Sequence, residues 1–253
     1  KPMNDKQRDI ILNAVVDAGI NFIDTAISYG NSEQLIGKFL KHKRDKFYLA
    51  TKGNLWKADD LEMQLNQSLK RLKTDYVDIY QLHNPTPDQC RSGELVDALN
   101  KFKKSGKCRW IGVSTSEPHF KKFVEWNSFD LFQIPYSALQ IENENTMNTA
   151  GKSGAGIIIN GAVALGEPDI GTGSKLVWGN FEKYNLQDFL DTNETKTSFM
   201  LRFTLSNKNA HTAIVGTTNP EHLKMNIDSV LKGPLDIALY NQVRKRIDNN
   251  PTM

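Results

Sequence analysis

Hydrophobic and polar positions along the chain alternate between two repeating patterns. Short runs of β-branched and aromatic residues predict strands, and segments with apolar residues at three- and four-residue spacing predict helices. A helical segment separates each strand-like run from the next. The seven predicted strands are 20–24, 47–51, 76–82, 109–113, 131–134, 156–159 and 212–215.

The predicted helices carry their apolar residues on one face. The first is expected to begin after a capping Asn4 and to end at Gly19. Its predicted apolar face is Ile10, Ile11, Ala14, Val15 and Ala18. Later apolar faces lie within 35–40, 61–72, 95–102 and 120–124, and further helices are predicted around 147–150, 199–205, 221–230 and 235–247.

This alternation predicts an α/β fold with a parallel sheet, because parallel neighbours need crossover connections. Both an open doubly wound sheet and an eight-stranded (β/α) barrel fit the pattern. No Gly-x-Gly-x-x-Gly follows an early strand, which removes the main support for the dinucleotide-binding doubly wound fold. We expect one domain over residues 1–253, with a long functional loop over 166–187.

Composition narrows the possible partners and compartments. The 253 residues carry a net charge of +3, too small a surplus for bulk binding to nucleic acid or a membrane surface. No apolar run reaches the roughly 18 to 20 residues of a membrane-spanning helix, and the mostly polar opening residues do not predict a secretory leader. Two cysteines and five scattered histidines indicate neither a disulfide framework nor a metal site. We therefore expect a cytoplasmic protein without a metal.

Ionisable residues follow three consecutive predicted strands. Asp24, Lys52 and His83 stand at the strand ends, and Tyr29 lies in the loop after Asp24. The active sites of (β/α) barrels form at the carboxyl ends of the strands, so these residues are expected at one rim.

The four residue types suit proton transfer to a carbonyl oxygen. A nearby ammonium is expected to lower the pKa of a tyrosine, a carboxylate can hold that ammonium charged, and a histidine can orient the carbonyl. The structural alternative is an ion pair between Asp24 and Lys52, with His83 bracing a loop.

A second candidate site follows the last predicted strand. The segment 216–221 ends a strand and opens a helix, and backbone N–H groups at a helix N-terminus bind phosphate. The structural alternative is an ordinary capped helix, with Asn219 as the N-cap and Pro220 at the first helical position.

Several motifs in a fixed order resemble the aldo-keto reductase superfamily. They span about residues 10 to 230 and are Asp24-Thr25-Ala26-Ile27-Ser28-Tyr29-Gly30, Ala50-Thr51-Lys52-Gly53, Gln81-Leu82-His83-Asn84-Pro85, Ile111-Gly112-Val113-Ser114, Gln133 with Tyr136-Ser137, and 214–223. The resemblance implies a (β/α)8 TIM barrel that binds NADPH without a Rossmann domain.

The resemblance also implies roles for single residues. Tyr29 is the implied proton donor, Lys52 and Asp24 adjust its pKa, and His83 orients the carbonyl. The implied cofactor ligands are Ser114 and Gln133 at the nicotinamide carboxamide, and Gly216, Thr217, Thr218, His222 and Asn226 at the phosphate and adenosine end.

The implied activity is NADP(H)-dependent reduction of a small-molecule aldehyde or ketone to an alcohol. The alternative is a cofactor-binding regulatory or interaction protein of the same fold. An assay of NADPH oxidation with a panel of aldehydes, and its loss in Tyr29→Phe, separates the two.

Four departures from the family limit what the resemblance implies. The first barrel strand is absent from the given sequence, and we expect it in the native gene product. Thr115 stands where many relatives carry Asn, and His222 where an Arg often reads the adenosine 2′-phosphate, so NADH is not excluded. Ala162 occupies the position of a ring that stacks on nicotinamide, and Tyr136 is the candidate substitute.

Overall fold

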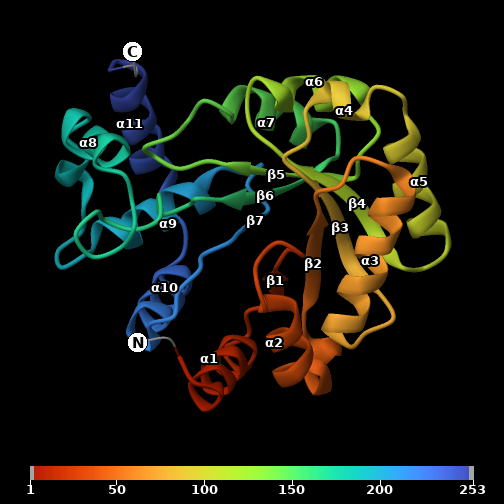
Figure 1. Cartoon of the computed structure of the whole chain (residues 1–253). Helices are drawn as coiled ribbons and strands as arrows, with labels where there is room; N and C mark the ends of the chain where they lie inside the picture. The colour runs from red at the N-terminus through yellow and green to blue at the C-terminus, as the bar shows by residue number, and fades with distance from the viewer. Residues whose placement is uncertain (1–2, 251–253) are drawn as a thin grey trace. The chain divides into compact units, whose positions relative to one another are not determined.

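A computed structural model describes residues 3–250 and contains seven strands within that range, all at the predicted places. The chain forms two compact units, one up to Gln133 and one from Ile134 onward. No helix within residues 3–250 is both long enough and apolar enough to cross a membrane. Each unit is described below by itself, with the elements labelled as in Figure 1.

The first unit is a parallel sheet whose strands follow chain order. Its strands are β1 (Phe22–Asp24), β2 (Tyr48–Gly53), β3 (Val77–His83), β4 (Cys108–Ser114) and the start of β5 (Leu131–Pro135). The helices are α1 (Asp5–Asp17), α2 (Ser32–Phe39), α3 (Ala58–Leu72), α4 (Pro87–Cys90), α5 (Glu94–Lys104) and α6 (His119–Trp126), with the 3-10 helix η1 (Lys41–Lys46). A helix between each pair of parallel strands is the predicted strand–helix repeat.

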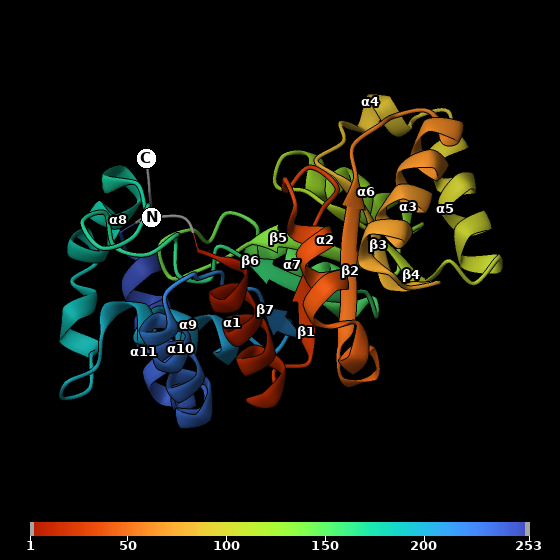
Figure 2. The same ribbon diagram turned by 60° about the horizontal axis from the view of Figure 1, so that its bottom comes forward.

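Helices α3 and α5 lie side by side against the strands of this unit (Figures 1 and 2). Their apolar faces are buried as predicted, with Leu61, Leu65 and Leu99 fully inaccessible to solvent. The strands β2 and β3 are buried along almost their whole length, as expected for a parallel sheet covered by helices. This packing fixes the direction in which the carboxyl ends of β1, β2 and β3 present their side chains.

The first helix differs in part from its prediction. Asn4 caps α1, accepting from the Gln7 N–H, and the Gln7 side chain accepts from the Asn4 N–H. The buried residues of α1, however, are Ile11 and Val16, whereas Ile10 is 57% exposed. The predicted face was wrong because its five apolar residues spread around a wide arc of the helix. The contact of α1 with α2 buries only a narrow part of that surface.

The second unit is mostly helical. Its elements are α7 (Glu144–Lys152), β6 (Gly156–Asn160), α8 (Lys175–Lys183), the 3-10 helix η2 (Leu186–Phe189), α9 (Lys196–Ser206), β7 (Thr212–Ala213), α10 (Pro220–Lys232) and α11 (Ile237–Asp248). Strand β6 pairs in parallel with β7, and α9 lies beside both α10 and α11 (Figure 2). The segment 166–187 is not one loop, since α8 forms inside it.

Candidate functional site

The structure brings the four ionisable residues predicted at the strand ends together in the first unit. Asp24 ends β1, Lys52 lies one residue before the end of β2, and His83 ends β3. Tyr29 lies in the turn after β1, where its N–H donates to the Ala26 carbonyl. Because the three strands are parallel and in register, their carboxyl ends deliver these side chains to one edge.

Asp24 and Lys52 form a buried ion pair at this edge. The Lys52 ammonium donates to both Asp24 carboxylate oxygens at 2.6 Å and to the Thr25 carbonyl at 2.9 Å. Both side chains are almost inaccessible, at 0% and 6% exposure. Three acceptors therefore use all the donors of the ammonium and fix its position.

Tyr29 and His83 lie against this ion pair. The two rings meet edge to face with centroids 5.6 Å apart, and the Lys52 ammonium lies 5.2 Å from the Tyr29 ring centroid. The Ser28 hydroxyl is 3.5 Å from His83 Nδ1, so a bond from Ser28 leaves the Nε2–H of a neutral imidazole to donate elsewhere. Tyr29 is 46% exposed, which makes its ring accessible from solvent.

Burial dominates the electrostatics of the four residues. It raises the pKa of Asp24 and lowers the pKa of Lys52, while the short contact between them acts in the opposite direction on both. Burial, and then the charge on Lys52, lowers the pKa of His83, so its imidazole is neutral near pH 7.

The expected effect of the lysine on the tyrosine is not seen. Burial, and then the negative charge of Asp24, raises the pKa of Tyr29 instead of lowering it. The reason is that the ammonium is already compensated by a carboxylate at 2.6 Å, so little net positive charge acts on the phenol. The phenol is therefore protonated at neutral pH.

Ser114 and Gln133, predicted at the nicotinamide carboxamide, are neighbours in the sheet. They are register partners on β4 and β5, and each is 3% exposed. The Gln133 side-chain carbonyl accepts a hydrogen bond from Gln81 Nε2 at 2.9 Å. Gln81, fully buried on β3, was not predicted as a site residue, although a glutamine between Tyr80 and Leu82 in a strand run was the available signal.

The second unit contains a cavity of about 730 Å³. It is formed by the turn after β6, the segment after β7 and the first turns of α10. All five residues predicted at the phosphate and adenosine end of the cofactor line it, namely Gly216, Thr217, Thr218, His222 and Asn226. Glu167, Ile214 and Met225 also line it and were not named as site residues, although Glu167 lies in the predicted loop 166–187 and Ile214 in the motif 214–223.

The start of α10 is capped by its own sequence. Asn219 accepts from the Glu221 N–H at 3.0 Å, and Pro220 is the first helical residue, as the structural alternative predicted. The cap and the cavity coexist, because Thr217, Thr218 and the helix N-terminus all face the same space. Hydroxyls and a helix N-terminus suit an anion, so this donor set fits the diphosphate of a dinucleotide.

Tyr136, the candidate substitute for a stacking ring, and Trp178 on α8 are both packing residues. Tyr136 is fully buried, donates to Glu144 at 2.6 Å and stacks on Phe203, so it offers no free face and the suggestion that it replaces the missing ring was wrong. Trp178 is 6% exposed and donates to the Ala164 carbonyl at 3.2 Å.

Comparisons with known proteins place the chain in one family. Residues 1–168 match the model of the aldo/keto reductase family. An oxidoreductase of Bacillus subtilis, YqkF, is 26% identical over 87% of this chain and 80% of its own length. The NADH-specific methylglyoxal reductase of Escherichia coli is 26% identical over 88% of this chain and 83% of its own.

The fold is shared with solved structures. The holo form of the aldo-keto reductase AKR11C1 from Bacillus halodurans superposes with a TM-score of 0.86, at 25% identity, over 97% of this chain and 88% of that one. The predicted α/β fold of the (β/α)8 class is thereby confirmed.

Proposed function

The chain belongs to the aldo/keto reductase family, and on that premise we propose that it reduces a small-molecule aldehyde or ketone to an alcohol with Tyr29 as proton donor. It is an NAD(P)H-dependent oxidoreductase. The observation that carries the proposal is a half-exposed, protonated phenol beside a buried Asp24–Lys52 ion pair and a neutral histidine. Cytoplasmic location is part of the proposal.

The bound nicotinamide supplies the hydride for the carbonyl carbon. Tyr29 O–H donates its proton to the carbonyl oxygen as negative charge develops there. The Nε2–H of neutral His83 donates a hydrogen bond to the same oxygen and orients the carbonyl. Asp24 keeps the Lys52 ammonium charged and in place, 5.2 Å from the Tyr29 ring centroid, and because this ion pair carries little net charge, Lys52 stabilises the phenolate left on Tyr29 only weakly.

We assign the cofactor contacts to two groups of residues. In the first unit, the Ser114 hydroxyl and the Gln133 amide hold the nicotinamide carboxamide. In the second unit, the cavity at the start of α10 holds the diphosphate and adenosine, through the residues Gly216, Thr217, Thr218, His222 and Asn226. NADPH is the proposed cofactor, with His222 as the partner of its 2′-phosphate.

The substitution Tyr29→Phe tests the proton donor. It removes only the hydroxyl, so we expect kcat for aldehyde reduction to fall by about 100-fold or more, the size of a general-acid contribution. The dissociation constant for NADPH, measured by fluorescence titration, should stay within about twofold, since one hydroxyl outside the cofactor contacts is lost.

Tyr48→Phe is the matched control. Tyr48 is 44% exposed, close to the 46% of Tyr29, but it lies at the start of β2 and packs against Trp110. Because Tyr48 lies outside the proposed site, removing its hydroxyl should leave kcat unchanged. Wild-type turnover in Tyr29→Phe would show that another group donates the proton.

A further inference from the structure

The segment that carries Tyr29 is held at both ends by side-chain hydrogen bonds. At its start, the Thr25 hydroxyl donates to the Ser32 hydroxyl at 2.9 Å. At its end, Glu33 in the first turn of α2 accepts from the Thr51 hydroxyl on β2 at 2.7 Å. Thr25 and Thr51 are fully buried, and Glu33 is 1% exposed. Tyr29 therefore lies between two points of the chain that are fastened to the protein interior.

Thr51 connects Glu33 to the lysine of the candidate site. Thr51 directly precedes Lys52 on β2, and neighbouring residues of a strand point to opposite faces of the sheet. Lys52 contacts the Asp24 carboxylate, whereas Thr51 contacts Glu33 on α2. The Ile27 N–H also donates to the Lys52 carbonyl at 3.2 Å. The turn that follows β1 is thus joined to β2 through its backbone and through the side chain of Glu33.

A buried carboxylate is a costly way to pack α2 against the sheet, since an apolar side chain would pack there without losing hydration. Arg71 at the end of α3 compensates part of this cost, because its Nη1 lies 3.4 Å from Glu33 Oε2 and 3.5 Å from the Ile27 carbonyl. The two helices approach closely at Gly37, one turn after Glu33, where a Cβ would overlap the Arg71 carbonyl. Glu33 therefore joins contacts from α3, from β2 and from the turn that carries Tyr29.

We propose that Glu33 is a positioning residue for the proton donor. About half of the Tyr29 side chain is exposed, so the backbone turn, and not the packing of the ring, fixes its place. Glu33 fastens α2 to β2 through Thr51, and the Ser32 N–H, which donates to the Tyr29 carbonyl at 3.0 Å, joins the start of α2 to that turn. The proposal rests on the proposed function, because the place of Tyr29 affects turnover only if Tyr29 donates the proton.

Thr51→Val and Glu33→Leu test this contact from its two sides. Each replaces a polar side chain by an apolar one of similar size, and Arg71 is 33% exposed, so it stays hydrated without Glu33. We expect kcat for aldehyde reduction to fall roughly tenfold in each variant, because a displacement on the order of 1 Å costs up to about 100-fold. The dissociation constant for NADPH should stay within about twofold. The double mutant should be no slower than the slower single variant, since both substitutions break one contact.

Asp78→Asn is the matched control for loss of a buried carboxylate. Asp78 is 2% exposed, close to the 1% of Glu33, and accepts from Arg44 and Arg109. It lies at the amino end of β3, whereas His83 lies at the carboxyl end. The substitution should lower the free energy of unfolding and leave kcat per folded molecule unchanged. A tenfold loss of kcat in Asp78→Asn would attribute the kinetic effects to general destabilisation and overturn the proposal.

A ¹H NMR measurement tests the place of Tyr29 without turnover. The Tyr29 and His83 rings meet edge to face with centroids 5.6 Å apart, so the ring current of Tyr29 shifts the resonance of the His83 Cε1 proton. In cofactor-free Thr51→Val at a fixed pH, we expect this resonance to move toward its position in Tyr29→Ala, which lacks the ring. Asp78→Asn should keep the wild-type position.

A wild-type His83 resonance in Thr51→Val would overturn the proposal, as would additive kinetic losses in the double mutant. If Tyr29→Phe turns over like the wild type, the proposed function fails instead. The His83 resonance then decides by itself whether Glu33 positions Tyr29.

Discussion

His83 shows how the surroundings of one residue set its chemistry. It stands at the end of β3 with its ring edge against Tyr29, and burial together with Lys52 lowers its pKa below the ordinary value of 6.5. Folding therefore favours the neutral imidazole. A neutral ring beside a compensated ammonium can donate one directed hydrogen bond without adding a second positive charge to the site.

This lowered pKa predicts a pH-dependent stability. Below pH 6.5 the unfolded chain binds a proton at this histidine that the folded chain binds only at lower pH, so the free energy of unfolding should fall as the pH drops from about 7 to 5. We expect His83→Gln to reduce this slope in urea unfolding measured at several pH values. His42→Gln, at an exposed position on η1, should keep the wild-type slope. An equal slope in all three proteins would contradict the prediction.

Residue identity was more predictable than residue state. The sequence places Asp24, Lys52 and His83 at strand ends, and regular parallel pairing then suffices to bring them together. The direction in which the pKa of Tyr29 shifts was predicted wrongly, because it depends on burial and on the 2.6 Å contact between Lys52 and Asp24. Gln81 was missed because its partner, Gln133, lies 52 positions away in the sequence, and strand β4 separates the strands that carry the two residues.

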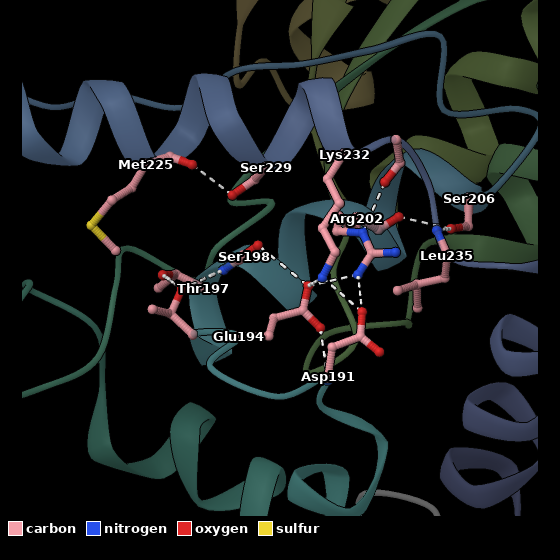
Figure 3. A network of polar contacts seen from close by, with 12 residues as sticks. Asp191, Glu194, Thr197, Ser198, Arg202, Ser206, Met225, Ser229, Lys232 and Leu235 are labelled. Carbon is pink, nitrogen blue, oxygen red and sulfur yellow. Dashed lines mark hydrogen bonds and ion pairs between the residues drawn. The ribbon is translucent and has the colours of Figure 1, made fainter.

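At the scale of elements, hydrogen bonds and ion pairs connect the segment before α9, which carries Asp191 and Glu194, to Arg202 on α9 and Lys232 on α10 (Figure 3). Arg202 Nη1 donates to Glu194 at 2.6 Å and to Asp191 at 3.3 Å, and its Nε donates to the Gly233 carbonyl. Lys232 contacts the same two carboxylates from the end of α10. The side chains of Glu194 and Arg202 are 2% and 8% exposed, so the central pair is buried.

Breaking this pair should destabilise the protein. In Arg202→Met, buried Glu194 keeps two neutral donors, the Asp191 N–H and the Ser198 hydroxyl, and one cation, Lys232 at 3.3 Å, and we expect the free energy of unfolding to fall by about 3 kcal/mol. Lys232→Met is the control, because that side chain is 43% exposed and its contacts contribute less than about 1 kcal/mol. Urea unfolding at neutral pH measures both. A similar loss in the two variants would show that burial does not set the strength of the network.

The elements themselves were largely predictable. All seven strands lie at the predicted positions, because β-branched runs bounded by turns have few alternatives in a parallel sheet. Helix α8 was missed inside a glycine-rich segment, although Ser174 caps it and Trp178 and Phe181 form a buried pair. Strand β7 is two residues shorter than predicted: the Ile214 N–H still donates to the Ile159 carbonyl on β6 at 2.7 Å, and Ile214 and Val215 then line the cavity.

For the whole molecule, the net charge of +3 does not indicate where an anionic ligand would bind. The charged residues that line each candidate site determine this instead. No Lys or Arg is among the described residues that line the cavity of the second unit, where the charged or titratable side chains are Glu167 and His222. On the proposed assignment, the start of α10 and the hydroxyls would hold a diphosphate there, and His222 alone would hold a 2′-phosphate.

Cofactor choice should therefore respond to one substitution. We expect His222→Arg to tighten NADPH binding about tenfold and to leave NADH unchanged, because only NADPH carries the phosphate that a guanidinium grips. Fluorescence titration with both cofactors measures this, with His222→Gln as the uncharged control. Tighter binding of both cofactors would place His222 near the diphosphate shared by the two.

The location of the two candidate sites in separate compact units has an evolutionary consequence. The residues proposed for proton transfer lie wholly before Gln133, and the residue proposed for the 2′-phosphate lies after Ile134. On that proposal, substitutions that change the preferred cofactor fall outside the segment that carries the acid chemistry. During evolution, the preference for NADPH or NADH can therefore change while the residue that donates the proton stays the same.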